Sequence, residues 1–344
     1  MKVTIDDVAR EAGVSTATVS RVINRNYPVA PKTRERVEAA IEKLEFSPNI
    51  LAKGLMMKRT NSIGVVIPSV MNPYFWQIVH KIEAVLKEHN YMAFLCYAVT
   101  AKEEYDYIRN LIQRSVDGII IVDGTSENRN NGYFERISKE VPLVLINGLH
   151  QGYKVNHVMA DQETGAKDAL RYLHSLGHRK IAYVTGLDPK VYAYGIKEKA
   201  YKEFLQEKGL PFNPDNILRL PGELGTRIIE VADAVEVLRS RFQKPDPPTA
   251  FFAANDVMGI SLIHGAKALG LSVPEDLSIV GFDDGLLAKI SNPLLTTVDI
   301  NTEELGLQSA RMIIDTIENG QNTGYKKVIL NTKLVLRDSC RPLY

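Results

Sequence analysis

The chain has 344 residues, which is long for a single domain, and its 45% hydrophobic content is enough to build a large core. Its net charge of +1 hides an uneven distribution, because residues 1–60 carry 11 Lys and Arg against 7 Asp and Glu, while the remainder carries 31 against 34. No apolar run approaches the roughly 18 residues of a membrane helix, and acidic side chains follow Lys2 at once, so we exclude a membrane protein and expect no secretion signal.

Residues 4–24 (TIDDVAREAGVSTATVSRVIN) predict two short helices joined by a tight turn. Thr4 can cap the first helix, and Gly13 suits the left-handed position that ends it. Ser15 can then cap a second helix that runs to about Asn24. The pattern is typical of a helix-turn-helix that enters the major groove of DNA, and it lies in the part of the chain with the basic excess.

The second helix has two different faces. Val19, Val22 and Ile23 share one of them, which suits a core. The other carries small side chains that permit close approach and polar ones that suit base edges and phosphates. We therefore predict that DNA is contacted by Thr16, Ala17, Ser20, Arg21 and Asn24.

A third helix is predicted from Pro31 onward, because apolar residues recur at helical spacing up to Leu44. These three helices make residues 1–47 a small all-α headpiece. Residues 48–61 then form a linker, in which Asn49 could cap a further helix of some two turns. Such a short helix containing Gly54 is marginal alone in water, so a flexible tether is the alternative.

From residue 62 to 344 the pattern alternates between apolar strands and amphipathic helices. The strands are predicted at IGVVI, MAFLCYA, GIIIV, LVLI, IAYVT, TAFFAA and LSIVGF, with helices near residues 73–89, 103–114, 132–139 and 303–318. Continuous apolar strands separated by helices predict parallel sheets covered on both faces. Two such units indicate doubly wound lobes that bind a ligand at the carboxyl ends of their strands.

These segments resemble the lactose-repressor (LacI/GalR) family of bacterial transcription regulators. The resemblance is carried by residues 4–24, by VEAAIEKLEFSPN and ILAKGL, and then by NPYF, DGIII, LGHRKIA, TAFFAANDVMG, LSIVGFDD and LVLRDS in this order. It implies a regulator whose core has two lobes of the periplasmic-binding-protein type. It also implies a hinge helix that forms on a near-palindromic operator, with DNA contacts from Asn49, Ala52, Lys53 and Leu55, the last as a wedge in the minor groove.

The same resemblance implies that the chain crosses between the lobes three times. The crossings are expected near Ala160, Asn292 and Gln321. The first lobe would then hold about residues 62–159 and 293–320, and the second about 160–292 and 321–344. A near-palindromic operator has two equivalent half-sites, so the resemblance implies a homodimer. We expect no tetramer, because no leucine heptad repeat follows LVLRDS.

By family position, a small molecule binds between the lobes. Its predicted contacts lie at strand ends or helix starts, and they are Asn72, Tyr74, Phe75, Asn147, Lys197, Asn255 and Asp283. Aromatic rings suit the apolar face of a sugar, and amides and carboxylates suit its hydroxyls, so a sugar or sugar derivative is the favoured effector. A helix cap is the alternative role for Asn72 and for Asp256.

Two positions depart from the family pattern. Lys197 stands where many members carry Arg, which replaces a two-pronged donor by a point charge, and Asn147 stands where Asp is frequent. The Lys197 departure leaves room for an anionic sugar, while a solvated helix charge is the alternative. Trp76, the single tryptophan, follows Phe75 and would report on the ligand, unless it turns into the core or a dimer contact.

Other classes of protein fit less well. A periplasmic sugar-binding protein shares the core but would need a signal peptide and would lack the helix-turn-helix. The seven histidines match no HExxH motif, GxGxxG is absent, and the adjacent Asp283 and Asp284 would point to opposite faces of an extended stretch. Cys96 and Cys340 match no metal-ligand spacing. We therefore predict a cytoplasmic regulator with no enzymatic activity, metal or cofactor, while a nucleobase or a phosphorylated protein remains an alternative effector.

Overall fold

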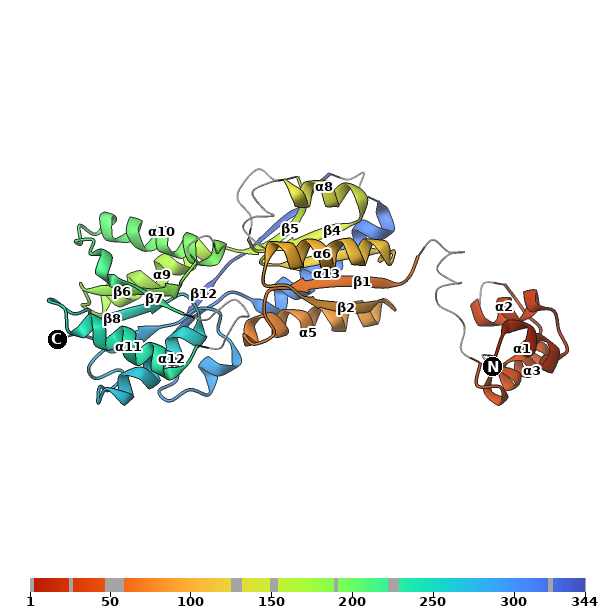
Figure 1. The fold of residues 1–344 in the computed structure, drawn as a ribbon, viewed down its shortest axis with the longest axis horizontal. Helices are drawn as coiled ribbons and strands as arrows, with labels where there is room; N and C mark the ends of the chain where they lie inside the picture. Colours follow the sequence, from red (N-terminus) through yellow and green to blue (C-terminus); the bar gives the residue numbers. More distant parts are fainter. Residues whose placement is uncertain are drawn as a thin grey trace. The chain divides into compact units, whose positions relative to one another are not determined.

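A computed structural model describes residues 3–24, 27–46, 59–124, 132–148, 154–188, 191–221, 229–320 and 324–343. The chain divides into two compact units, Met1–Thr60 and Asn61–Tyr344 (Figure 1). Within these described ranges, no helix is both long enough and apolar enough to cross a membrane. The hinge residues predicted from the sequence, Asn49, Ala52, Lys53 and Leu55, lie outside the described residues.

The first unit is a bundle of three helices. They are α1 (Ile5–Ala12), α2 (Thr16–Asn24) and α3 (Pro31–Lys43). Val8, Val19 and Val37, one from each helix, are fully buried and form its core. Thr4 caps α1 in a capping box with Asp7, as the sequence indicates. The α1–α2 turn is thus held by local signals that the sequence displays.

The first lobe of the second unit contains a six-stranded parallel sheet. In their order across the sheet the strands are β11 (Lys327–Leu330), β5 (Asn156–Ala160), β4 (Leu143–Ile146), β3 (Gly118–Val122), β1 (Ser62–Ile67) and β2 (Met92–Tyr97). Its helices are α5 (Pro73–Glu88), α6 (Ala101–Gln113), α8 (Tyr133–Glu140) and α13 (Thr302–Asn319). Alternate residues of a strand pack to opposite faces, so Val65 joins the core under α5 while Val66 packs beneath α6 and α8. This two-sided burial explains why the inner strands β3 and β4 are apolar throughout.

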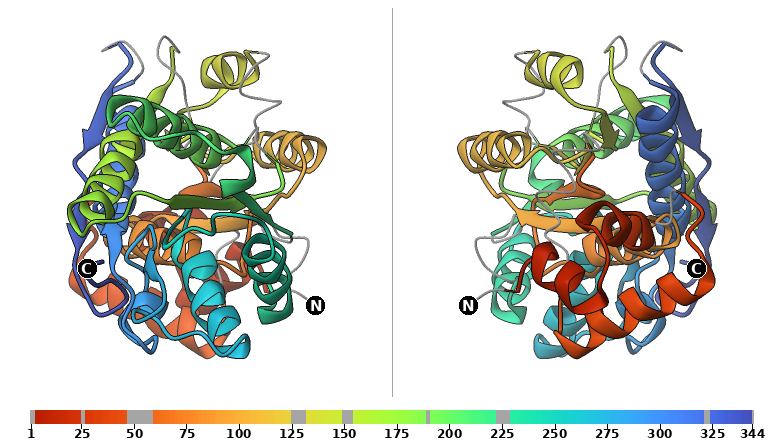
Figure 2. Two further views of the ribbon diagram at one scale, coloured as in Figure 1. Left: turned by 90° about the vertical axis from the view of Figure 1, so that its left-hand side faces the viewer. Right: turned by 90° about the vertical axis from the view of Figure 1, so that its right-hand side faces the viewer.

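The second lobe contains a four-stranded parallel sheet. Its strands, in order, are β7 (Ile217–Leu220), β6 (Ile181–Gly186), β8 (Ala250–Ala253) and β9 (Ser278–Val280). Its helices are α9 (Gln162–Ser175), α10 (Tyr192–Glu207), α11 (Val231–Phe242) and α12 (Asp256–Ala268), with 3-10 turns η1 (Pro214–Asn216) and η2 (Leu286–Lys289). In Figure 2, α9 lies beside α10 and α11 beside α12, on opposite sides of the sheet. The architecture is therefore the predicted one, a helical headpiece with two doubly wound lobes.

The crossings between the lobes differ from two of the expected positions. After β9, residues Thr296 and Asp299 pair in parallel with Val280 and Asp283, so this stretch extends the second lobe's sheet past residue 292. The chain returns to the first lobe only near Ile300, just before α13. It then remains there through β11, because β11 pairs with β5.

The last crossing therefore lies near residue 331 rather than near Gln321. Beyond it, β12 (Lys333–Val335) pairs antiparallel with β10 (Thr297–Asp299). Both strands have three residues, and their partners lie far away in sequence. Such short strands give little periodicity that could have corrected the positions implied by the family resemblance.

Candidate functional site

The helix α2 presents the residues that the sequence assigned to DNA. Ser15 accepts a hydrogen bond from the Thr18 backbone amide at 3.2 Å, which caps the helix start. Thr16, Ala17 and Arg21 are exposed, and the last two lie on the side of the helix opposite the buried Val19. This face is open to a large partner such as the edge of a base-paired duplex.

The remaining two residues of this face are linked to each other. The Asn24 side-chain amide donates to Ser20 Oγ at 3.2 Å, and both residues are half-buried. Tyr27, which the sequence analysis did not single out, is 62% exposed, and its ring centroid lies 5.6 Å from the Arg21 guanidinium carbon. The exposed position of Tyr27, shortly after the helix predicted to contact DNA, makes it a further candidate for this interface.

The second unit contains a cavity of about 310 Å³. Both lobes contribute to its lining, and each segment comes from a strand end or a helix start. The lining comprises Pro68, Asn72, Tyr74, Phe75, Val99, Thr100, Ala101, Asp123, Gly124, Gln162, Asp188, Val191, Tyr192, Ala193, Tyr194, Lys197, Ala254, Asn255, Asp283 and Ile300. Its size falls in the range of small-molecule sites.

Six of the seven side chains predicted to contact the effector line this one cavity, and Asn147 does not. Asn147 lies behind Tyr74, where its amide donates to the Tyr74 hydroxyl at 2.7 Å and its side-chain oxygen accepts from the Ala160 amide at 2.9 Å. Burial, together with the charges of Asp123 and Asp283, raises the pKa of Tyr74 well above its usual value. Asn147 thus holds the uncharged Tyr74 side chain in the wall of the cavity.

Two of the lining asparagines also cap helices. The Asn72 side-chain oxygen accepts from the Tyr74 amide at 3.0 Å, and that of Asn255 accepts from the Met258 amide at 2.9 Å. The capping role, raised as an alternative for Asn72, therefore coexists with a place in the cavity. The cap commits the oxygen of each amide group and fixes the direction of the side chain.

Lys197 is neither solvated nor extended toward the middle of the cavity. It is 2% exposed, its ammonium group donates to the Ala254 carbonyl at 2.8 Å, and it lies 3.8 Å from the centroid of the Phe282 ring. Burial lowers its pKa to about 8, although Asp283 and other nearby carboxylates oppose this effect. The solvated helix charge considered from the sequence is therefore wrong for this residue.

Several polar residues of the lining were not predicted from the sequence as ligand contacts. They are Thr100, Asp123, Gln162, Asp188, Tyr192 and Tyr194. Asp123 directly follows β3, and Asp188 comes two residues after β6, so the rule that ligands bind at the carboxyl ends of parallel strands would have found both. Gln162 begins α9 and offered no comparable signal.

Trp76 does not line the cavity. Its side chain is 45% exposed and lies against a separate surface hollow that also includes Gln77 and His80. The helix α5 therefore directs Tyr74 and Phe75 into the cavity and Trp76 away from it. Its fluorescence can report on a ligand only indirectly.

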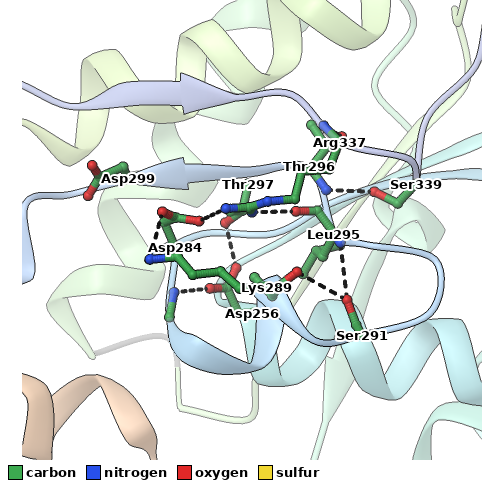
Figure 3. Close-up of polar contacts among 12 residues, drawn as sticks. Asp256, Asp284, Lys289, Ser291, Leu295, Thr296, Thr297, Asp299, Arg337 and Ser339 are labelled. Atoms are coloured by element: carbon green, nitrogen blue, oxygen red, sulfur yellow. Dashed lines mark hydrogen bonds and ion pairs between the residues drawn. The ribbon is translucent and has the colours of Figure 1, made fainter.

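A buried polar network lies next to the cavity (Figure 3). Asp256, which follows Asn255, is 4% exposed and accepts hydrogen bonds from Thr297 Oγ1 at 2.5 Å and from the Gly285 amide at 2.7 Å. Burial raises the pKa of Asp256 to about 7, against the lowering effect of these two bonds. This network joins α12 to β10, which lies just before the chain returns to the first lobe.

A second acidic side chain extends the network to the segment that follows β12. Asp284, which follows Asp283, forms ion pairs with Arg337 at 2.5 Å and with Lys289 at 3.3 Å. Arg337, beyond β12, also donates to the Leu295 carbonyl at 2.8 Å (Figure 3). The segments just before the second crossing and just after the third are therefore bonded to the parts of the chain that carry Asn255 and Asp283.

A helix-turn-helix unit joined to a two-lobed core with an inter-lobe cavity defines a class of ligand-controlled DNA-binding proteins, and comparison with known proteins agrees. Residues 4–49 match the model for bacterial regulatory proteins of the lacI family, and residues 170–340 match the periplasmic binding protein-like domain. The chain is 35% identical to catabolite control protein A of Priestia megaterium over 315 residues, which cover 91% of this chain and 92% of that protein.

Solved structures extend the likeness to the whole chain. The lac repressor dimer bound to operator and an anti-inducer has a TM-score of 0.86 and 25% identity, covering 99% of this chain and 100% of that one. The complex of the regulator CelR with cellobiose has a TM-score of 0.70 and 29% identity, covering 98% and 100%. This chain belongs to the LacI family and is a DNA-binding transcription regulator, not an enzyme.

Proposed function

We propose that this regulator is a cytoplasmic repressor whose affinity for its operator is set by a small molecule bound in the inter-lobe cavity. The observation that carries the proposal is the convergence of six sequence-predicted side chains, drawn from both lobes, on one cavity. The headpiece reads a near-palindromic operator through α2, with Thr16, Ala17, Ser20, Arg21 and Asn24 at or beside base edges. Leu55 wedges into the minor groove.

A sugar or sugar derivative is the effector that the lining supports best. The rings of Tyr74 and Phe75 lie 4.8 Å apart and at 62° to each other, and they give an apolar wall for the face of a sugar ring. Amide and carboxylate groups from Asn72, Asn255 and Asp283 then suit its hydroxyls. A relative that binds cellobiose, 29% identical, supports the same class.

The homodimer is supported by an apolar edge. The strand β2 is the last strand of the first lobe's sheet, and Met92, Phe94 and Leu95 on it are 60%, 43% and 50% exposed. An exposed apolar edge strand is a liability in a monomer and usually marks an interface. The related lac repressor was solved as a dimer on its operator. In such a dimer, a ligand that changes the angle between lobes alters the spacing of the two hinges and hence DNA affinity.

Operator binding is tested by selecting a DNA site from a random pool with the full-length protein and then measuring affinities by fluorescence anisotropy. Arg21→Ala should cost about 1–3 kcal/mol and relax preference at one base position if Arg21 contacts a base edge. Equal loss on every sequence would make it a phosphate contact. Leu55→Ala should weaken operator binding far more than binding to random DNA, and equal losses would exclude the wedge.

The effector is tested by screening sugars and nucleobases for a rise in melting temperature, because a ligand specific to the native state stabilises it. Each ligand that stabilises the protein is then added to the operator complex. Asp283→Asn and Asn255→Asp should abolish the response, and Asn255→Asp keeps the oxygen that caps α12. Asn110→Ala, on an exposed part of α6, is the matched control. Native affinity in both cavity variants would place the site elsewhere.

Assembly is tested by light scattering at micromolar concentration. Phe94→Glu should convert a dimer into a monomer, since it puts a charge into the apolar edge. Phe212→Glu changes a residue of the second lobe that is 49% exposed, and it should leave the dimer intact. A tetramer, or a dimer unaffected by Phe94→Glu, would contradict the assigned interface.

A further inference from the structure

The lining of the cavity holds more negative than positive groups. Among the described residues that line it, Asp123, Asp188 and Asp283 carry carboxylates, and Lys197 supplies the one ammonium group. Carboxylates are ordinarily ionised at neutral pH. A ligand entering the cavity therefore meets a net negative field. The choice of ligand class rests on the proposed function, in which the effector binds in this cavity.

The ammonium group of Lys197 is already engaged within the wall. It donates to the Ala254 carbonyl at 2.8 Å and lies against the Phe282 ring at 3.8 Å. Asp283, Asp123 and Asp256 all exert electrostatic attraction on it. An anionic ligand would have to compete with these groups for one buried charge while being repelled by the same carboxylates.

The polar groups of the wall also favour a ligand that donates hydrogen bonds. The Asn147 amide is directed to the Tyr74 hydroxyl, so it stabilises the wall and not a ligand. Gln162 lines the cavity and is 3% exposed, and its side-chain oxygen has no hydrogen-bond partner among the described protein groups. A buried acceptor without a donor is unfavourable, and a donor on the ligand would remove this cost.

The carboxylates do not converge as ligands of a metal ion. Across the described ranges of the chain, no group of three acidic, histidine or cysteine side chains could hold one. Asp188 is exposed, while Asp283 is 8% exposed. Dispersed acceptors around an aromatic wall fit an organic cation with several donors better than an inorganic one.

We propose that the cavity takes an amine-bearing sugar, whose ammonium and hydroxyl groups donate to Asp188, Asp283 and Gln162, in preference to the neutral or acidic sugar of the same ring. The first two residues select for the positive charge. Gln162 selects for a donor irrespective of charge. An anionic sugar, which the Lys197 departure had left open, is disfavoured.

The test compares matched triads by calorimetry with the full-length protein: glucose, glucosamine and glucuronate, and the galactose and mannose equivalents. At least one amino sugar should bind about tenfold more tightly than its neutral parent at low ionic strength, and its uronate should bind most weakly. Added salt should reduce the preference for the amine and leave neutral-sugar binding unchanged.

Two variants and one control separate charge from hydrogen bonding. Asp188→Asn should reduce the preference for the amine over the neutral sugar of the same ring by about threefold or more. Gln162→Met should weaken the neutral and amino sugars alike by about tenfold. Asp168→Asn removes an exposed carboxylate of α9 outside the cavity and should change neither quantity.

The outcomes distinguish this inference from the proposed function. Tighter binding of a uronate, equal binding of an amino sugar and its parent, or no binding by any member of the triads would overturn the amine preference. A nucleobase that binds and changes operator affinity would do the same, while leaving regulation by a small molecule in place. An amino sugar that binds as expected but leaves operator affinity unchanged would support the inference and contradict the proposed function.

Discussion

Replacing Asp256 by Asn should remove a pH-dependent loss of stability. Asn has nearly the same shape, and its side-chain oxygen can accept from the Gly285 amide while its amide donates to Thr297, whose hydroxyl can also accept. Both hydrogen bonds can therefore persist in Asp256→Asn. The change that remains is the loss of a buried group that can become charged.

The magnitude follows from the pKa of Asp256. Burial raises it from 3.8 to about 7, so between these values the folded state holds a proton that the unfolded state has released. The free energy of unfolding then falls as pH rises through this window and stays lower above it. The full effect is about 4 kcal/mol, of which about 3 kcal/mol falls between pH 5 and pH 8.

The assay is urea unfolding of wild type and Asp256→Asn at pH 5 and pH 8, followed by circular dichroism. The stability of the variant relative to wild type should be about 3 kcal/mol more favourable at pH 8 than at pH 5. Asp106→Asn, an exposed carboxylate on α6, is the control and should show no such difference. A difference between variant and wild type that is equal at the two pH values would refute the reasoning.

Three further predictions rest on single contacts. Arg36 donates to the Gly13 carbonyl at 3.2 Å, so Arg36→Ala should lower the unfolding free energy of the headpiece by about 1–2 kcal/mol in thermal melts, whereas the exposed Arg34→Ala should not. Tyr74→Phe leaves the Asn147 amide without its partner and should lower the unfolding free energy of the core by about 1–3 kcal/mol in urea. Separate measurements of ligand affinity should exclude a loss of ligand binding as the cause. Burial lowers the pKa of Lys197 from 10.5 to about 8, so the free energy of unfolding of wild type relative to Lys197→Met should rise by about 2 kcal/mol between pH 7 and pH 10. A relative stability that is the same at the two pH values would contradict a buried charge.

Local signals explain how much could be predicted. The capping box of Thr4 and Asp7, the Pro at the start of α5 and the apolar strands are short-range features, and they fixed the headpiece and the alternation of the core. Tyr74 and Phe75, which the family position predicted as ligand contacts, line the cavity because α5 begins after the loop that follows β1. Such features depend on neighbours within a few residues, which a single sequence displays.

The remainder depends on pairings between distant segments. The crossing near residue 331 follows from β11 joining β5, which lies some 170 residues earlier in the chain. Gln162 reaches the cavity because α9 begins where the first crossing ends. The engagement of Lys197 requires Ala254 and Phe282, from two other strand ends of the second lobe. None of these contacts leaves a periodic pattern in the sequence around the residue concerned.

Two pairs of consecutive residues join the cavity to the segments that cross between the lobes. Asn255 and Asp283 line the cavity, while the residue after each, Asp256 and Asp284, bonds to a crossing segment (Figure 3). The extended stretch expected at residues 283 and 284 is wrong, because both residues have positive φ, 112° for Asp283 and 52° for Asp284. This turn still places a side chain that lines the cavity next to one that pairs with Arg337. We expect a ligand that displaces Asp283 to disturb the carboxylate that holds Arg337, because only one peptide unit separates the two residues. In the proposed function, this short stretch would couple the cavity to the angle between the lobes.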